Sequence, residues 1–239
     1  MKKLFFALLT LISLYSFGQQ TVINDPNAQK RTLSGSFNAI KVSSGIQLYL
    51  TQGDEESIAV SASDSKYMER FKTEVEGGTL KIYFDQKGLT WINSEKRKLK
   101  AYVSFKTLQH LDGSSGADVF TKSVLKLPAL DMEFTSGSRF EGEVDVDDLS
   151  TDQGSGSEIS ITGKAGKLKV EVSSGAIFKG FDLTTDFCEA KASSGGGARV
   201  TVSKELAAKA SSGGGVRYKG GAAIKDLDVS SGGVVKRAD

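Results

Sequence analysis

The sequence has very little of the two residue types on which many catalytic and metal sites depend. Its 239 residues include one histidine, His110, and one cysteine, Cys188. A single histidine excludes metal sites that need several imidazoles, and it leaves most serine-based triads without a base. We expect His110 to be a turn or surface residue. A single cysteine excludes a disulfide within the chain, and we expect Cys188 to be a buried, apolar thiol.

Long apolar runs are scarce as well. The one clear run, Phe5–Leu14, is too short to favour a membrane span. Because lysines precede it and small residues follow it, we predict a signal peptide over residues 1–18. The protein is then exported without spanning a membrane, to the periplasm, the outer surface or the extracellular medium. Losing Lys2 and Lys3 takes the formal charge from +2 to about zero, which argues against a nucleic-acid partner.

What the sequence does contain in quantity is a short triplet, Ser/Thr/Gly-Ser-Gly, that returns seven times in its second half. A further copy, Ser43-Ser44-Gly45, stands far upstream. The spacings between successive triplet glycines are 21, 19, 19, 20, 18 and 19 residues, and these glycines are Gly116, Gly137, Gly156, Gly175, Gly195, Gly213 and Gly232. A fixed period of about 20 residues indicates stacked structural units rather than one irregular core.

Positions at the same distance from the triplet glycine share their chemistry. The columns three residues before and three residues after it are apolar or small, apart from Gln153, so we expect both to face inward. The column four residues before it is charged in every unit and should face water. Its members are Asp112, Glu133, Asp152, Glu171, Lys191, Lys209 and Asp228.

Each unit therefore predicts a strand, a tight corner, a second strand and a looser turn. Stacked units of this kind form a parallel β-solenoid, for which a right-handed path is favoured. The glycine supplies the positive φ that a sharp corner needs. The serine before it recurs in all seven units, and its hydroxyl could bond a backbone group of the corner or of the next coil. We interpret these serines as structural, because no base accompanies them.

The first part of the chain is less regular. We divide the sequence into the signal peptide, a flexible segment over residues 19–35, larger N-terminal coils that form a cap over residues 36–110, and a repeat solenoid over residues 111–239 that continues the same domain. Within the cap, Asp64 can begin a short helix with Tyr67, Met68 and Phe71 on one face, and residues 73–84 indicate either a hairpin or a longer coil. At the C-terminal end, only residues 233–239 follow the last triplet, so this end has less cover than the N-terminal end. We therefore expect that copies of the chain could associate there.

These features together resemble a known family. The segment Phe37–Ile46 reads Phe-Asn-Ala-Ile-Lys-Val-Ser-Ser-Gly-Ile, a Gln52-Gly53-Asp54 turn follows, and serial Ser-Ser-Gly coils close the chain. The pattern resembles the auto-transporter adhesin "head GIN domain" family of Bacteroidetes over roughly Arg31 to Val235. The resemblance implies a right-handed parallel β-helix, similar in shape to pectin-lyase-like folds, and a role in adhesion at the cell envelope. The family offers no catalytic residues to transfer.

Stacking places acidic residues in one outward row. Oxygen-only ligands of this kind suit Ca²⁺, and like charges about 5 Å apart repel unless a cation bridges them. The candidate cation ligands are Asp131, Glu133, Asp152 and Glu171. A solvated face, a weak cation site and a catalytic carboxylate cluster all remain open interpretations of this row.

A second row, four residues after the glycine, is basic in the last coils. Its members are Lys179, Arg199, Arg217 and Lys236, and Lys219 widens it. Such a row is either a solvated face or a surface that binds an anionic glycan or lipopolysaccharide. It could also face the acidic row of another copy.

The sequence favours a non-enzymatic, exported interaction or adhesion module of the cell envelope. It implies no cofactor, and a cell-surface glycan or an envelope protein is its expected partner. One alternative is a carbohydrate-binding protein, or a lyase- or hydrolase-like enzyme, that uses the acidic row. Another is a structural spacer.

Overall fold

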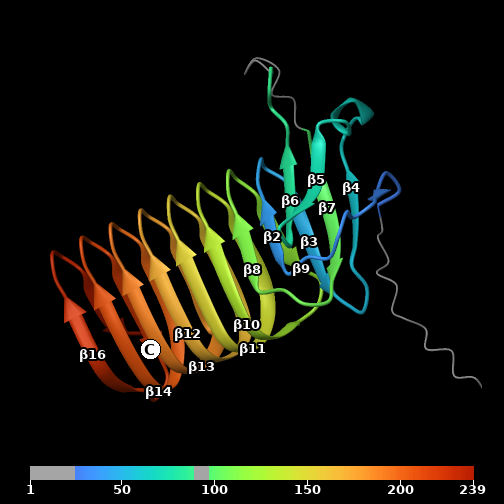
Figure 1. Ribbon diagram of the computed structural model, residues 1–239. Coiled ribbons are helices and arrows are strands. Elements are labelled where there is room, and N and C mark those ends of the chain that lie inside the picture. The colour runs from blue at the N-terminus through green and yellow to red at the C-terminus, as the bar shows by residue number, and fades with distance from the viewer. Residues whose placement is uncertain (1–24, 89–96) are drawn as a thin grey trace, which may run out of the picture.

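Residues that stand one repeat apart in the sequence lie side by side in the computed structural model, which describes residues 25–88 and 97–239. Strand β11 (Arg139–Gln153) pairs in parallel with β12 (Glu158–Val172), so that Leu149 lies opposite Leu168 and Asp152 opposite Glu171. The chain is almost entirely β-structure, and the predicted parallel β-solenoid is confirmed (Figure 1). The expected signal peptide over residues 1–18 lies outside the described residues.

The repeat region winds through seven corners that form a row along one edge of the molecule (Figure 1). We call the strands that lead into the corners the entry flank and those that lead away from them the exit flank. Long strands bend once, opposite the corner, and contribute to both flanks. The strands are β8 (His110–Gly113), β9 (Asp118–Thr121), β10 (Leu125–Phe134), β11, β12, β13 (Ile177–Ala192), β14 (Gly197–Ala210), β15 (Gly215–Lys219), β16 (Ala223–Val229) and β17 (Val234–Arg237).

The corners are type I′ turns, and their serines differ from our expectation. In each repeat both the serine and the glycine have positive φ, 46–54° for the seven serines and 70–74° for the glycines. The glycine N–H of one corner donates to the serine carbonyl of the next, as from Gly137 to Ser155 at 3.0 Å. From the sequence, the serine hydroxyls could have bonded a backbone group of the corner or of the next coil. Instead they are exposed and make no hydrogen bond within the described residues, because the positive φ turns the side chain outward.

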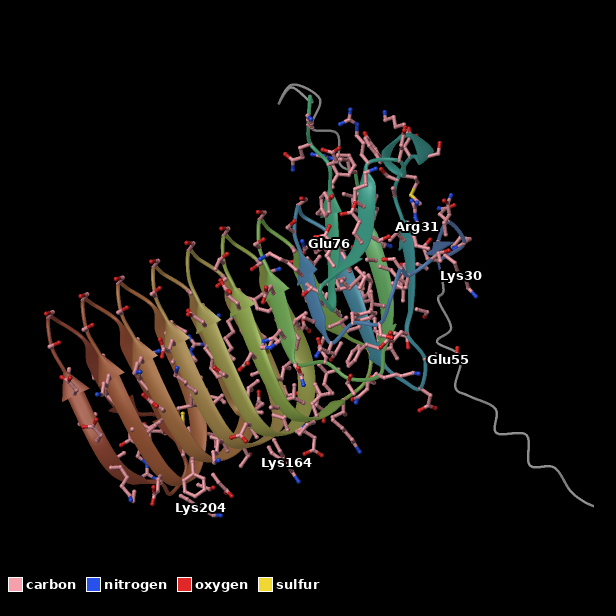
Figure 2. The ribbon with its side chains drawn as sticks, in the orientation of Figure 1. Lys30, Arg31, Glu55, Glu76, Lys164 and Lys204 are labelled. Atoms are coloured by element: carbon pink, nitrogen blue, oxygen red, sulfur yellow. The ribbon has the colours of Figure 1, made fainter. Side chains whose placement is uncertain are left out.

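The inward columns behave as predicted, and the size of their side chains varies from coil to coil. Phe134, Phe140 and Phe178 are fully buried in the earlier coils, whereas Ala192 and Ala198 take the equivalent positions in a later one. Gln153, the polar exception, also faces inward and donates from Nε2 to the Ile177 carbonyl at 3.1 Å. Charged residues such as Lys164 and Lys204 project outward from the bends opposite the corners (Figure 2).

The N-terminal region caps the solenoid, but its coils do not follow the order of the sequence. Strands β2 (Ala39–Val42) and β3 (Gln47–Gln52) form a coil that is sandwiched between the coil of β8 and β9 and an outer coil of β6 (Thr79–Phe84) and β7 (Lys100–Phe105). The chain thus passes to the outermost position and returns. Antiparallel strands β5 (Phe71–Glu76), β4 (Ser57–Ser61) and β1 (Gln29–Arg31) cover the two outer edges.

Two local expectations in this region can be compared with the structure. The expected helix is one 3-10 turn, η1 (Ser65–Tyr67), in which the Asp64 carboxylate accepts from the Lys66 N–H at 2.9 Å. Residues 19–35 were expected to be flexible, yet the described part of this segment is tied down. Strand β1 pairs with β4, and Asp25 accepts hydrogen bonds from Ser61 at 2.7 Å and from Tyr102 at 2.8 Å.

The described part of the chain contains no helix with the length and apolar character needed to cross a membrane.

The close approach of neighbouring coils near the corners makes one prediction for stability. A Cβ atom added at Gly214 would lie 2.4 Å from the carbonyl carbon of Ala192, a backbone atom that cannot move aside. At the next residue, Gly215, the nearest atom to such a Cβ is 3.9 Å away. We expect Gly214→Ala to lower the free energy of unfolding by about 2 kcal/mol. Gly215→Ala should leave it within about 0.5 kcal/mol of the wild type.

Urea unfolding of both variants, followed by circular dichroism, makes this comparison directly. Equal stability of the two variants would contradict the close approach of neighbouring coils at Gly214.

Candidate functional site

The predicted basic row forms on the exit flank of the last coils. Lys179 lies opposite Arg199, Arg199 opposite Arg217, and Arg217 opposite Lys236, each on a neighbouring strand. Neighbouring strands are about 4.8 Å apart, so residues that are 18 to 20 positions apart in sequence form one continuous line of charge. All four side chains are at least partly exposed.

Most of this row lacks anionic partners. Lys179 Nζ lies 2.7 Å from a carboxylate oxygen of Glu158 and is therefore neutralised. Arg199, Arg217 and Lys236 take part in no ion pair within the described residues. Beside the two arginines, the outward position two residues earlier is a glycine, Gly197 or Gly215, so the surface next to the guanidinium groups is flat. Lys219, which was expected to widen the row, lies 4.8 Å above the Phe181 ring.

The same column carries an aromatic stack at its other end. Tyr49, which lies four residues after the upstream triplet, has its ring centroid 5.2 Å from that of Tyr102 and 5.4 Å from that of Phe120. Lys122 Nζ lies 4.8 Å from the Tyr49 centroid. Sequence reasoning missed this stack because only the seven regular repeats were aligned. Extending the column to the upstream Ser-Ser-Gly would have placed Tyr49 beside Phe120.

The aromatic stack is anchored by a hydrogen-bonded carboxylate. Burial, and then the hydrogen bond to Asp25, raise the pKa of Tyr102. The hydrogen bond from Ser61 is the main cause of the lowered pKa of Asp25, and the bond from Tyr102 adds to it. Lys100 Nζ lies 3.9 Å from the same carboxylate. This arrangement attaches the N-terminal segment to the cap and leaves the tyrosine hydroxyl protonated.

The acidic row forms on the entry flank as predicted. Asp112, Glu133, Asp152 and Glu171 occupy matching positions on successive strands. Lysines close the row at both ends, because Lys41 Nζ lies 3.7 Å from Asp112 and Lys191 Nζ 3.3 Å from Glu171.

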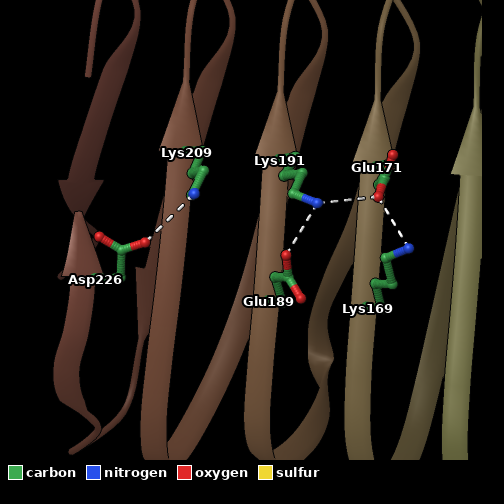
Figure 3. A network of polar contacts seen from close by, with 6 residues as sticks. All are labelled: Lys169, Glu171, Glu189, Lys191, Lys209 and Asp226. Carbon is green, nitrogen blue, oxygen red and sulfur yellow. Dashed lines mark hydrogen bonds and ion pairs between the residues drawn. The ribbon is translucent and has the colours of Figure 1, made fainter. Parts of the chain in front are cut away.

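A network of lysine and glutamate side chains continues from Glu171 toward the C-terminus (Figure 3). Lys169 Nζ lies 3.0 Å from Glu171, and Lys191 Nζ lies 3.0 Å from Glu189. The hydrogen bond from Lys169 is the largest cause of the lowered pKa of Glu171, and the hydrogen bond to Glu189 is the largest cause of the raised pKa of Lys191. This end of the acidic row is neutralised by the protein itself.

The four candidate cation ligands do not form a compact cluster. Asp131 lies 3.4 Å from His110 Nδ1 at the edge of the row, and Glu171 is held by its two lysines. Among residues 25–88 and 97–239, no group of three or more histidine, cysteine, aspartate or glutamate side chains is placed to hold a metal ion. The part of the row without a lysine partner consists of Glu133 and Asp152.

A shallow groove of about 400 Å³ crosses the lower part of the entry flank. Phe187, which is 39% exposed, lies among its lining residues. The lysines on its rim are paired with acids, Lys167 with Asp148 at 3.5 Å and Lys225 with Glu205 at 3.1 Å. This groove offers an apolar surface with neutralised charges, in contrast to the basic row of the exit flank.

Comparison with known proteins adds a family and a set of related folds. A family model described as "Putative auto-transporter adhesin, head GIN domain" matches residues 36–222. No curated protein matches the chain.

Several crystal structures share the fold. A putative adhesin from Bacteroides fragilis is 18% identical with a TM-score of 0.78, and the match covers 88% of this chain and 96% of that one. A putative adhesin from Parabacteroides merdae is 19% identical with a TM-score of 0.65, covering 89% and 95%. A putative lipid binding protein from Parabacteroides distasonis is 19% identical with a TM-score of 0.61, covering 90% and 98%.

The single cysteine provides a test of the inward column on the entry flank. Cys188 is 5% exposed, and burial raises the pKa of its thiol to about 12. Because the thiolate is the reactive form, we expect the native protein to resist labelling by a thiol reagent at pH 8. After unfolding in guanidinium chloride, one thiol per chain should react. Fast labelling of the native protein would show that this column does not face the core.

Proposed function

The chain belongs to the family described as putative auto-transporter adhesins with a head GIN domain, and from that premise we propose that it is a non-enzymatic, exported adhesion module of the cell envelope that binds an anionic glycan. The basic row on the exit flank is the binding surface. The observation that carries this proposal is the run of three in-register cations, Arg199, Arg217 and Lys236, without ion partners in the described chain.

Such a row carries an electrostatic cost in the free protein. Two like charges about 4.8 Å apart repel by about 1 kcal/mol even at the dielectric constant of water. Elsewhere on the same flank the chain avoids this cost, since Arg139 lies 3.7 Å from Asp118 and 3.8 Å from Glu158. An anionic ligand would remove the repulsion between Arg199 and Arg217, so binding gains from charges that the fold leaves uncompensated.

The shape of the surface favours an extended ligand. Arg199 and Arg217 stand at matching positions of neighbouring coils, and Gly197 and Gly215 leave the neighbouring strip without side chains. Arginine presents a planar fork of donors that matches carboxylate, sulfate or phosphate groups. A polymer with regularly spaced acidic groups can contact several coils at once, which suits adhesion better than a closed pocket would.

The non-enzymatic part of the proposal is supported by the charge pairing of the entry flank. Glu171 is neutralised by Lys169 and Lys191, and the lowered pKa of its carboxyl makes it a poor general acid. The names given to the family and to two of the similar folds, putative adhesins, agree with a binding role.

The binding surface is tested with Arg199→Gln/Arg217→Gln and a matched control, Lys167→Gln/Lys225→Gln. Both double variants lose two exposed cations, but the control lysines are already paired with acids on the opposite flank. Binding to immobilised dextran sulfate and polygalacturonate is measured at low salt, with neutral dextran as the blank. We expect the arginine variant to bind about two- to thirtyfold more weakly and the control to bind nearly as the wild type does.

Equal losses in the two variants would show that only net charge matters, and no loss in either would remove the exit flank as the surface. The same glycans are assayed for newly formed unsaturated or reducing ends. Turnover that disappears in Glu133→Gln/Asp152→Asn would overturn the non-enzymatic assignment.

A further inference from the structure

The last coil of the solenoid exposes side chains that belong to the core. Ile224, Leu227 and Val229 occupy columns that face inward in the preceding coil, where Leu206, Ala208 and Ala210 are at most 2% exposed. In the last coil these positions are 43%, 55% and 47% exposed. The dry interior therefore opens at this end into an apolar surface, which we call the open end.

The strands of the last coil also have unpaired edges. Strand β16 pairs with β14 and strand β17 pairs with β15, and within the described residues nothing pairs with their outer sides. The opposite end of the solenoid is different, because antiparallel strands β1, β4 and β5 lie across it. Figure 1 shows β16 as the outermost strand on the side away from the cap. An edge of this kind is a template for pairing with another strand.

We propose that the open end is a homodimer interface in which β16 of one copy pairs antiparallel with β17 of a second copy. A two-fold axis that is parallel to the last coil, lies between the two copies and runs in the direction from bend to corner places one corner over the other. Because β16 runs toward its corner and β17 away from it, this axis brings the two strands together in opposite directions on both flanks. The two apolar surfaces then cover each other.

Charge complementarity selects this arrangement over the alternatives. Strand β16 carries Asp226 and Asp228 outward, whereas β17 carries Lys236 outward. Neither Asp228 nor Lys236 has an ion partner within the described chain, and the proposed pairing brings them together twice across the interface. Pairing β16 with β16 would instead oppose acid to acid, which is destabilising between neighbouring strands.

The symmetry also fixes the size of the assembly. A two-fold contact uses the same surface on both copies and closes on itself. The other end of each copy is covered by the antiparallel cap, so growth should stop at two chains. The contact involves one coil from each copy, which predicts a weak, reversible dimer with a dissociation constant in the micromolar range.

The test is sedimentation equilibrium of the full exported chain over a concentration series from micromolar to millimolar. We expect a reversible monomer–dimer equilibrium. Asp228→Lys and Lys236→Asp should each raise the dissociation constant roughly tenfold, because each replaces two attractive contacts with repulsive ones. The double variant Asp228→Lys/Lys236→Asp restores opposite charges across the interface and should return the constant to near the wild-type value.

Two further variants complete the design. Leu227→Gln should weaken the dimer through its apolar contact while leaving thermal unfolding of the monomer nearly unchanged, since the side chain is more than half exposed there. Asp54→Lys makes the same change as Asp228→Lys at an exposed residue of the N-terminal region, and it should not affect association. A monomer at every concentration, a dimer that neither single charge reversal weakens, or an assembly larger than two chains would overturn the proposal. Lys236 also belongs to the basic row, so association is measured without any glycan, and the glycan test is made on Arg199 and Arg217, which are unchanged in every variant here.

Discussion

The structure depends on a backbone hydrogen bond that repeats at every corner. The glycine N–H of one corner donates to the serine carbonyl of the next, at 3.0–3.2 Å along the whole series from Gly45 to Ser231. This bond forms only if the chain turns at the same place in each coil, and the turn requires positive φ at two successive residues. A Ser-Gly pair satisfies that requirement and recurs about every 20 residues. This recurrence fixes the register of every side chain between the corners.

Once the register is fixed, side chains act as columns rather than as single residues. A column that faces inward builds the core, which changes from Phe134 to Ala192 in the column before the corner and from Phe178 to Ala198 in the column after it. A column that faces outward places the charges of successive coils next to one another on the surface. The entry flank mixes signs and neutralises itself around Glu171, whereas the last coils of the exit flank collect arginine and lysine without acids. The difference between the two flanks gives the molecule one face suited to anions.

The repeat predicted most of this arrangement, because distance from the triplet glycine is sufficient to assign a residue to a column. Lys179, Arg199 and Glu133 lie where that counting places them. The counting could not predict that β6 and β7 form a coil outside β2 and β3, since that depends on which strand edges meet across long sequence separations. It also offered the corner serine hydroxyls as the groups that form hydrogen bonds between coils, whereas the serine backbone carbonyls accept these bonds. Asp25 was assigned to a flexible segment because residues 19–35 are polar, and its partners, Ser61 and Tyr102, could not be identified because they are distant in sequence.

The most direct test of the account is a pair of disulfide variants in a Cys188→Ala background. Arg199→Cys/Arg217→Cys joins two positions that the register places on adjacent strands, with Cα atoms about 4.8 Å apart and within reach of a disulfide. Arg199→Cys/Lys219→Cys shifts the second position by two residues, to about 8 Å, which is too far. The account predicts that mild oxidation closes the first pair and leaves the second reduced. Closure of the second pair, or of neither, would contradict the in-register stack and the basic row built on it.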